Sequence, residues 1–243
     1  MNFLVFRLYG PLASWGQAAV GGDRPTGLYP TRSAVIGLLA AALGLKREQE
    51  QEMEHLNNSV QIAVKQFFPS SLMRDYHTAQ VPSTKRGVTH LTRKSELSEE
   101  KLNTILSSRD YRCDGVWVIA IRLIDGSFYT LFQLEKALLK PVFTLYLGRK
   151  SCPLAVPLMP SVVETNNLRE ALDTSFPALT RSLKEDNLWF NASNWVTYYW
   201  EGDKSELGKG SVMTTYPWDN PISKTRWQFS QRLVYQLSIQ EGV

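Results

Sequence analysis

Cysteine and histidine are scarce in this sequence. Its 243 residues include two cysteines and three histidines. Two thiols are too few for a disulfide framework, and Cys113 and Cys152 have no metal-ligating neighbour at close spacing, so we expect both to be reduced. The histidines, His55, His77 and His90, do not have metal-ligand spacing either. We therefore expect no metal site and no cofactor.

Long apolar runs are missing as well. The longest covers residues 34–45 and is too short to cross a bilayer. Arg7 interrupts the only early apolar run, which argues against a signal peptide. P-loop, paired-carboxylate, serine-hydrolase and zinc signatures are absent too. Because it has neither a membrane-length apolar run nor a recognisable signal peptide, the protein is expected to be cytoplasmic, with no membrane partner.

A strong charge imbalance is also absent. The formal net charge is +4, and 43% of the residues are hydrophobic and 21% charged, as in an ordinary soluble globular protein. Mild basicity permits a nucleic-acid partner without requiring one. The length allows one large domain or two small ones, with a real core.

A basic turn stands out among the features that are present. Residues 145–153 read Leu-Tyr-Leu-Gly-Arg-Lys-Ser-Cys-Pro. The glycine would let a ligand approach the main chain. The arginine guanidinium after it can bind phosphate through two hydrogen bonds, and the lysine ammonium adds a positive charge. The candidate contacts are Lys140, Tyr146, Gly148, Arg149, Lys150 and Ser151. The turn either binds a polyanion or is a solvated basic loop, and its residues leave both readings open.

Hydrophobic periodicity predicts the fold. Alternating apolar residues indicate strands at residues 2–9, 59–68, 116–124 and about 156–163. Helices are expected from a cap at Thr31 or Ser33 to Gly44, and over residues 128–139. This β-α-β-β-α-β order is an α+β fold of the ferredoxin-like (RRM-like) type.

Two segments modify this plan. Residues 70–115 are too long for a hairpin loop and must form an insertion between strands 2 and 3. Residues 166–243 carry tryptophans in short alternating runs, which we interpret as a small antiparallel β-rich region. We therefore expect a ferredoxin-like domain over residues 1–165, with the architecture that RNA-recognition modules also use, and a small β-rich C-terminal region over residues 166–243.

The insertion is basic. Residues 74–112 hold eight cations and five acids, and eight minus five gives a net charge of +3. Apolar residues lie among them, which indicates an arm with a short apolar helix that inserts along a nucleic-acid strand or against a partner. A surface hairpin without a partner is the alternative. If the insertion does bind RNA or a partner, the candidate contacts are Arg74, His77, Lys85, Arg86, Arg93, Lys94, Arg109 and Arg112.

Other candidates lie near the first helix. Trp15 could stack on a base, although packing in the core is the commoner role of a tryptophan. Arg24 and Arg32 flank the start of the helix, where Arg32, Ser33 and the free amides would make a phosphate site. A capped helix with solvated arginines is the alternative.

Two arginines interrupt the predicted central strands. If Arg7 and Arg122 lie on one open face of the sheet, they contact either phosphate or acids beneath the C-terminal region. We favour the second reading, because half-buried charged residues are often paired. The aromatic signature of an RNP-type RNA-recognition sheet is absent.

Four segments of the chain, in order and with fitting spacing, resemble the CasD-type subunits of type I-E CRISPR Cascade complexes, members of the RAMP superfamily. They are Gly10-Pro11 with Ser14-Trp15-Gly16-Gln17, Arg24-Pro25-Thr26-Gly27 with Pro30-Thr31-Arg32-Ser33, Arg74-Asp75-Tyr76-His77-Thr78, and Tyr146-Leu147-Gly148-Arg149-Lys150-Ser151-Cys152-Pro153-Leu154. The resemblance covers about residues 2–160 and weakens beyond them. Each motif is weak alone, and the four together are specific.

This resemblance implies a non-catalytic subunit that binds the 5′ handle of guide RNA (crRNA) and caps the backbone filament in antiviral defence. Its partners would be the guide RNA, the adjacent backbone subunit and the large PAM-recognising subunit, with target DNA contacted indirectly. The insertion would be the thumb of the family, which wedges into the guide RNA, and Gln17 joins the implied RNA contacts. The alternatives are a metal-independent endoribonuclease using His77 and Tyr76, or a stand-alone RNA-binding module.

Overall fold

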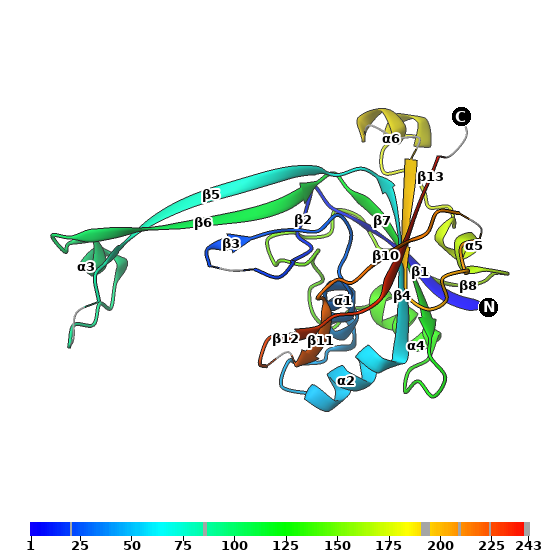
Figure 1. The fold of residues 1–243 in the computed structure, drawn as a ribbon, viewed down its shortest axis with the longest axis horizontal. Helices are drawn as coiled ribbons and strands as arrows, with labels where there is room; N and C mark the ends of the chain where they lie inside the picture. The colour runs from blue at the N-terminus through cyan, green and yellow to red at the C-terminus, as the bar shows by residue number, and fades with distance from the viewer. Residues whose placement is uncertain (20, 85–86, 191–194, 209, 224, 241–243) are drawn as a thin grey trace.

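The computed structural model describes residues 1–243 apart from residues 20, 85–86, 191–194, 209, 224 and 241–243. The candidates Lys85 and Arg86 therefore lie outside the described residues. Figure 1 shows a body built around one sheet, seen almost edge-on, from which a long two-stranded ribbon projects.

Seven antiparallel strands form the central sheet, in the order β10-β13-β9-β4-β7-β1-β8. They are β1 (Asn2–Tyr9), β4 (Val60–Phe68), β7 (Val116–Leu123), β8 (Ser161–Glu164), β9 (Trp195–Trp200), β10 (Met213–Thr215) and β13 (Val234–Gln240). The four strands predicted from alternation are β1, β4, β7 and β8, and the mixed α+β class is confirmed. The fourth is short and lies at the edge of the sheet, where proline before a strand is tolerated.

Two helices lie against one face of this sheet. The first, α1 (Arg32–Leu43), begins with Thr31, whose hydroxyl accepts a hydrogen bond from the Ala34 amide, and ends at Gly44 in the left-handed conformation. The second, α4 (Leu131–Leu139), begins with a capping box of Thr130 and Gln133. A third helix, α2 (Glu50–Ser59), leads into β4. Both predicted helices are therefore present, and Thr31 rather than Ser33 is the cap.

The alternation of β1 divides its side chains between two buried cores. Leu4, Phe6 and Leu8 pack with apolar residues of α1 and α4. Phe3 and Val5 pack on the opposite face with α5 (Leu168–Leu172) and with residues of β9. The sheet is therefore covered on both sides.

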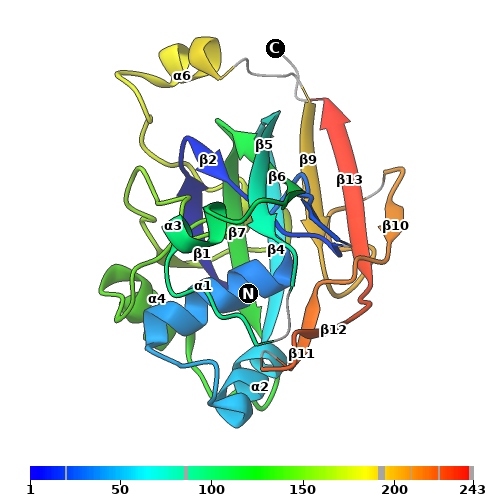
Figure 2. The ribbon, with the colours of Figure 1, turned by 90° about the vertical axis from the view of Figure 1, so that its left-hand side faces the viewer.

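The C-terminal region differs from the separate small sheet that we expected. Its strands are antiparallel, but β9 pairs with β4, and β13 and β10 follow, so they extend the first sheet (Figure 2). A strand at the edge of a sheet has unpaired backbone groups, and β9 satisfies those of β4. One sheet therefore spans the boundary expected at residue 165. A separate hairpin, β11 (Asn220–Ser223) and β12 (Gln228–Ser230), lies beside α1 and α2.

The insertion is mainly β-structure. Strands β5 (Ser71–Pro82) and β6 (Leu102–Cys113) pair without a break. At about 3.3 Å per residue this ribbon is roughly 40 Å long. Two short strands, β2 (Leu12–Ala13) and β3 (Asp23–Arg24), pair with β6 at its base. We call β5, β6 and the residues between them the arm.

The arm contains a short helix, as expected, but that helix is mainly polar. The helix α3 (Arg93–Leu97) has five residues and none of them is buried. Leu102, Ile105 and Leu106 belong to β6 instead. Their spacing imitates a helical face, although the backbone there is extended.

None of the helices in the described part of the chain combines the length and the apolar character that a membrane span needs.

Candidate functional site

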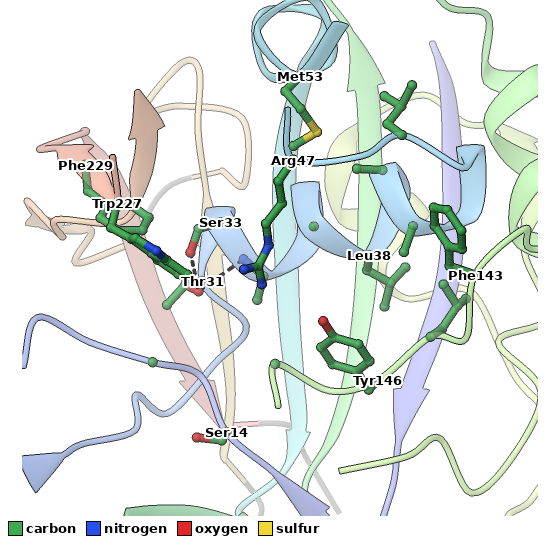
Figure 3. Close-up of a pocket in the computed structure, with 18 of the residues that line it drawn as sticks. Ser14, Thr31, Ser33, Leu38, Arg47, Met53, Phe143, Tyr146, Trp227 and Phe229 are labelled. Carbon is green, nitrogen blue, oxygen red and sulfur yellow. Dashed lines mark hydrogen bonds between the residues drawn. The ribbon is translucent and has the colours of Figure 1, made fainter. Parts of the chain in front are cut away.

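An open groove of about 1010 Å³ runs beside α1. Its walls come from four stretches of chain: the loop after β2, α1 with the residues that follow it, the segment before the basic turn, and the C-terminal hairpin. Figure 3 shows side chains of these stretches turned toward one another. Five predicted contacts line it, namely Gln17, Arg24, Ser33, Tyr146 and Gly148.

The floor of the groove is made by small residues of α1. Ala34, Gly37 and Ala41 line it. A methyl group added at Gly37 would meet no atom within 4 Å, so this glycine faces the groove and leaves room above the helix. A ligand can therefore approach the helix backbone closely.

Aromatic and cationic side chains form the two rims. Phe143 and Tyr146 lie on one side, and Trp227 and Phe229 on the other (Figure 3). Trp218 also lines the groove and is 60% exposed. Among the described lining residues the cations are Arg24, Lys46 and Arg47, and the single acid is Glu48. This composition favours an anionic ligand with aromatic rings.

The basic turn is held in place by the chain itself. Tyr146 and Pro153 form an isolated bridge, and the Leu147 amide donates to the Cys152 carbonyl at 2.7 Å. Gly148 has φ +83°, and a Cβ there would lie 1.8 Å from the carbonyl oxygen of Ser14. Glycine is needed at this position because the Ser14 backbone approaches it, so packing alone accounts for Gly148, which also lines the groove.

The guanidinium of Arg149 is partly used within the fold. It donates to the carbonyls of Asp110 at 3.3 Å and Arg24 at 3.0 Å, and lies 4.9 Å from the centre of the Tyr111 ring. Arg149 therefore joins the basic turn to the base of the arm. Lys150 and Ser151, and Lys140 at the end of α4, are exposed.

The start of α1 is occupied by an acid from the C-terminal region. The Arg32 amide donates to Asp219 Oδ2 at 2.7 Å, and the Ser33 amide to the Asp219 carbonyl at 3.1 Å. The Asp219 carboxylate also binds Arg232 at 2.6 and 3.0 Å. The helix amides expected to hold phosphate are thus satisfied internally.

Arg32 is a buried structural residue. Its guanidinium bonds Glu201 at 2.5 Å, the Asn57 side chain at 3.1 Å and the Val60 carbonyl at 3.1 Å. Glu201 in turn binds Arg232 at 2.9 Å. A buried arginine with these partners cannot meet a phosphate in this structure, so the predicted role of Arg32 is corrected.

Trp15 is also buried rather than available for stacking. It is 1% exposed and meets Trp117 edge-to-face, with ring centroids 5.0 Å apart. The core role is confirmed, and the assignment of Trp15 as an RNA contact is wrong. Gln17 and Arg24, in contrast, are exposed at the groove.

The base of the arm carries an ion pair. Arg74 donates to both carboxylate oxygens of Asp110, at 2.8 and 3.0 Å. These hydrogen bonds hold the pKa of Asp110 below its usual range. Arg112 donates to the Gly27 carbonyl at 3.0 Å, while Arg109 is exposed.

The proposed catalytic pair is not brought together. Tyr76 and His77 are neighbours on β5, and side chains of successive strand residues point to opposite faces. His77 instead lies 3.4 Å from Asp75 on its own face. Near the tip, Arg93 pairs with Glu96 at 2.5 Å and Lys94 is exposed.

Arg122 follows the favoured interpretation, whereas Arg7 lies beneath the C-terminal region but contacts a carbonyl and an aromatic ring instead of an acid. Arg122 pairs with Glu206 at 2.7 Å. Arg7 is 6% exposed, donates to the Pro177 carbonyl and lies 5.5 Å from the centre of the Phe176 ring. Both arginines therefore support the packing of the C-terminal region on the sheet.

Cys113 and Cys152 are free thiols. Burial raises the pKa of the Cys152 thiol. Within the described residues, no three side chains of histidine, cysteine, aspartate or glutamate gather as a metal site would require.

Sequence reasoning missed part of the groove. The missed residues are Lys46, Arg47, Phe143, Trp218, Trp227 and Phe229. They stand in no motif, and the hairpin reaches the groove only through tertiary packing. The available signal was the cluster of tryptophans after residue 195, which we assigned to strands.

The chain is similar in sequence to CRISPR-associated proteins. The sequence pattern of the family described as CRISPR-associated protein (Cas_Cas5) matches residues 3–235. The CRISPR system Cascade subunit CasD of Escherichia coli (strain K12) is 37% identical over 179 residues, covering 70% of this chain and 75% of that protein.

Two solved structures have the same fold. A chain of a CRISPR RNA-guided surveillance complex has a TM-score of 0.67 and 26% identity, covering 99% of this chain and 91% of that one. A crystal structure of a Cas protein has a TM-score of 0.64 and 24% identity, covering 98% and 95%. The family pattern spans almost the whole chain, and the chain accordingly belongs to the Cas5 family of CRISPR-associated proteins as a homologue of a Cascade subunit.

Proposed function

We propose that this chain is the non-catalytic subunit of a type I-E Cascade that binds the 5′ handle of guide RNA and caps the backbone filament. The observation that carries the proposal is the convergence of the four resembling segments. Residues 14–17, 24–33 and 146–151 meet at the groove, and Arg74 shares Asp110 with Arg149. Exposed cations and aromatic rings in one groove suit unpaired RNA.

The arm would act as the thumb and meet the adjacent backbone subunit. A two-stranded ribbon has no core of its own and is marginally stable in water. Leu72, Tyr76, Ile105 and Leu106 are each more than half exposed on it. A partner surface or a nucleic-acid strand would cover them.

The core would be ferredoxin-like. The order β8-β1-β7-β4 places the first and third strands of the core at its centre, and α1 and α4 contribute to the same core cluster. The two-part division at residue 165 would then not separate two independently folding units, because β9 pairs with β4.

The enzyme alternative is less well supported. General acid–base cleavage needs its groups within reach of one phosphate. On β5, His77 is directed away from Tyr76. The subunit would therefore hold RNA in a cytoplasmic complex, leave target recognition to base pairing and reach DNA through the large PAM-recognising subunit.

The test is to express the partner subunits and guide RNA with and without this chain. We expect the chain to co-purify with guide RNA whose 5′ end resists nuclease, and we expect that protection to disappear without it. A complete complex with an equally protected 5′ end in the absence of this chain would contradict the proposal. Purified protein should also leave repeat RNA uncut, with or without chelator.

A further inference from the structure

Trp227 has a backbone conformation that tryptophan rarely adopts. Its φ is +53°, in the left-handed region that favours glycine and asparagine. Its side chain is 62% exposed and lines the groove, so burial in a core does not explain the conformation. Strained residues of this kind concentrate at binding sites, where the surrounding structure holds them.

The turn that carries Trp227 is fastened to the body. Glu50 of α2 accepts hydrogen bonds from the hydroxyls of Ser223, at 2.8 Å, and Thr225. The Ser223 hydroxyl also accepts from the Arg226 amide at 3.2 Å. The other end of β11 is held by Asp219 at the start of α1. The indole is therefore presented by a braced hairpin.

A cation lies over one face of this indole. The guanidinium carbon of Arg47 is 4.9 Å from the centre of the Trp227 ring, and both side chains point into the groove (Figure 3). Arg47 is exposed, as is its neighbour Lys46. The pair thus combines a flat aromatic face with positive charge that a phosphate can reach.

We propose that Trp227 and Arg47 form a stacking site for one unpaired nucleotide, the base lying on the indole and the adjoining phosphate against Arg47. The site takes any base, because every base has a flat face, and it rests on the RNA-binding function proposed above. The charge of the lining residues, three cations and one acid, favours an anionic ligand such as a phosphodiester.

The first test measures binding of the full chain to a labelled single-stranded RNA that carries the repeat-derived 5′ handle, at several salt concentrations. Trp227→Ala is expected to weaken binding by about five- to a hundredfold with no change in the salt slope, since a stack carries no charge. Arg47→Gln is expected to lower the slope of log K against log[salt] by about 0.7, the effect of one lost phosphate contact. Trp189→Ala is the matched control, because that tryptophan is 71% exposed on α6 (Leu183–Trp189), outside the groove.

A scan of abasic nucleotides along the RNA locates the stacked base. We expect one position at which wild-type protein loses affinity while Trp227→Ala protein is insensitive. Trp227→Asn separates function from packing: asparagine tolerates the left-handed conformation, so the variant is expected to melt no lower than wild type and still to bind RNA weakly.

Four outcomes would overturn the inference. If Trp227→Ala protein binds RNA as tightly as wild-type protein does, the stacking site is wrong but the proposed function stands. Lower melting of Trp227→Asn would show that the indole is held for packing. If Trp227→Ala protein binds RNA normally but no longer assembles with the partner subunits, Trp227 contacts a protein partner instead of a base. If wild-type protein fails to bind the RNA, the proposed function fails, and the stacking site with it.

Discussion

Asp219 and Arg32 are joined across 187 residues by a hydrogen bond of 2.7 Å from the backbone amide to the carboxylate. The carboxylate lies at the first turn of α1, where the helix dipole stabilises negative charge. The same atoms that bind Asp219 were predicted to bind phosphate. Through Asp219, the C-terminal region thus caps α1, the helix that forms the floor of the groove.

Replacing Asp219 with alanine is expected to destabilise the whole protein. The change leaves Arg232 buried with one carboxylate partner fewer and frees an amide of α1. Breaking a buried pair in this way costs about 3–5 kcal/mol. Chemical denaturation measures the loss. Asp125→Ala, at an exposed turn, is the control and should stay within about 0.5 kcal/mol of wild type.

Gly148→Ala and Gly126→Ala form a matched pair. Both glycines have positive φ, +83° and +82°, so alanine should cost each about 1 kcal/mol of backbone strain. Only Gly148 has an atom, the Ser14 carbonyl oxygen, in the space of the new methyl group. We therefore expect Gly148→Ala to lose about 3 kcal/mol or more in total. Equal losses in denaturation of the two variants would contradict this account of the turn.

Arg74→Ala is expected to make the protein more sensitive to acid. The bonds from Arg74 depress the pKa of Asp110, so they stabilise the folded state above the unfolded pKa of about 3.9 and are lost as pH falls through the folded pKa. Removing Arg74 raises the pKa of Asp110 toward its usual value, although Arg149 and Arg112 still lie near. The acid unfolding midpoint should therefore move to higher pH.

The control for that titration is Arg93→Ala. Arg93 pairs with Glu96 near the tip of the arm, away from Asp110. An acid midpoint that moves equally in both variants would indicate a general effect of removing positive charge.

Shortening the arm is expected to spare the fold and abolish assembly. Ala79 and Ile105 lie opposite each other in the ribbon, so residues 80–104 can be replaced by an Asn-Gly turn. The base of the arm, where β3 pairs with Ser108 and Arg109, is kept. Melting should stay close to that of wild type while the adjacent backbone subunit no longer co-purifies. The double variant Ile105→Ser and Leu106→Ser keeps the arm at full length and tests its apolar residues alone.

The Arg149→Ala and Lys150→Ala variants should differ in whether they change protein stability as well as RNA binding. Lys150 is exposed, so its loss should lower only the salt slope of RNA binding, by about 0.7 for one phosphate. Arg149 joins the turn to the arm, so its loss should also lower the melting temperature. Equal melting of the two variants would show that the Arg149 contacts contribute little to the fold.

Local patterns predicted the central strands and α1 because each buries one regular face. Leu4, Phe6 and Leu8 alternate toward one core, and Thr31 and Gly44 carry the cap chemistry of α1. The strands of the arm have no buried face over most of their length, so alternation there carries no signal. The apolar residues of β6 fell by chance at helical spacing.

The site was harder to predict than the fold. A motif shows which residues occur together but not whether they face solvent, and Trp15 and Arg32 proved to be buried. Arg47 and Trp227 are 180 positions apart along the chain, 227 minus 47, and meet through the packing of the hairpin on α1 and α2. Nothing in either local sequence marks that meeting.

The bond between Asp219 and α1 also sets an order in time. A chain is synthesised from its N-terminus, and domains fold as their parts emerge. Residues 2–160 can pair β1, β7 and β4 early, but the first turn of α1 keeps free amides until residue 219 leaves the ribosome. The hairpin with Trp227 arrives later still. The groove is therefore completed late in synthesis, with only β13 still to be added to the sheet, and a nascent chain cannot engage its ligand before most of the fold is made.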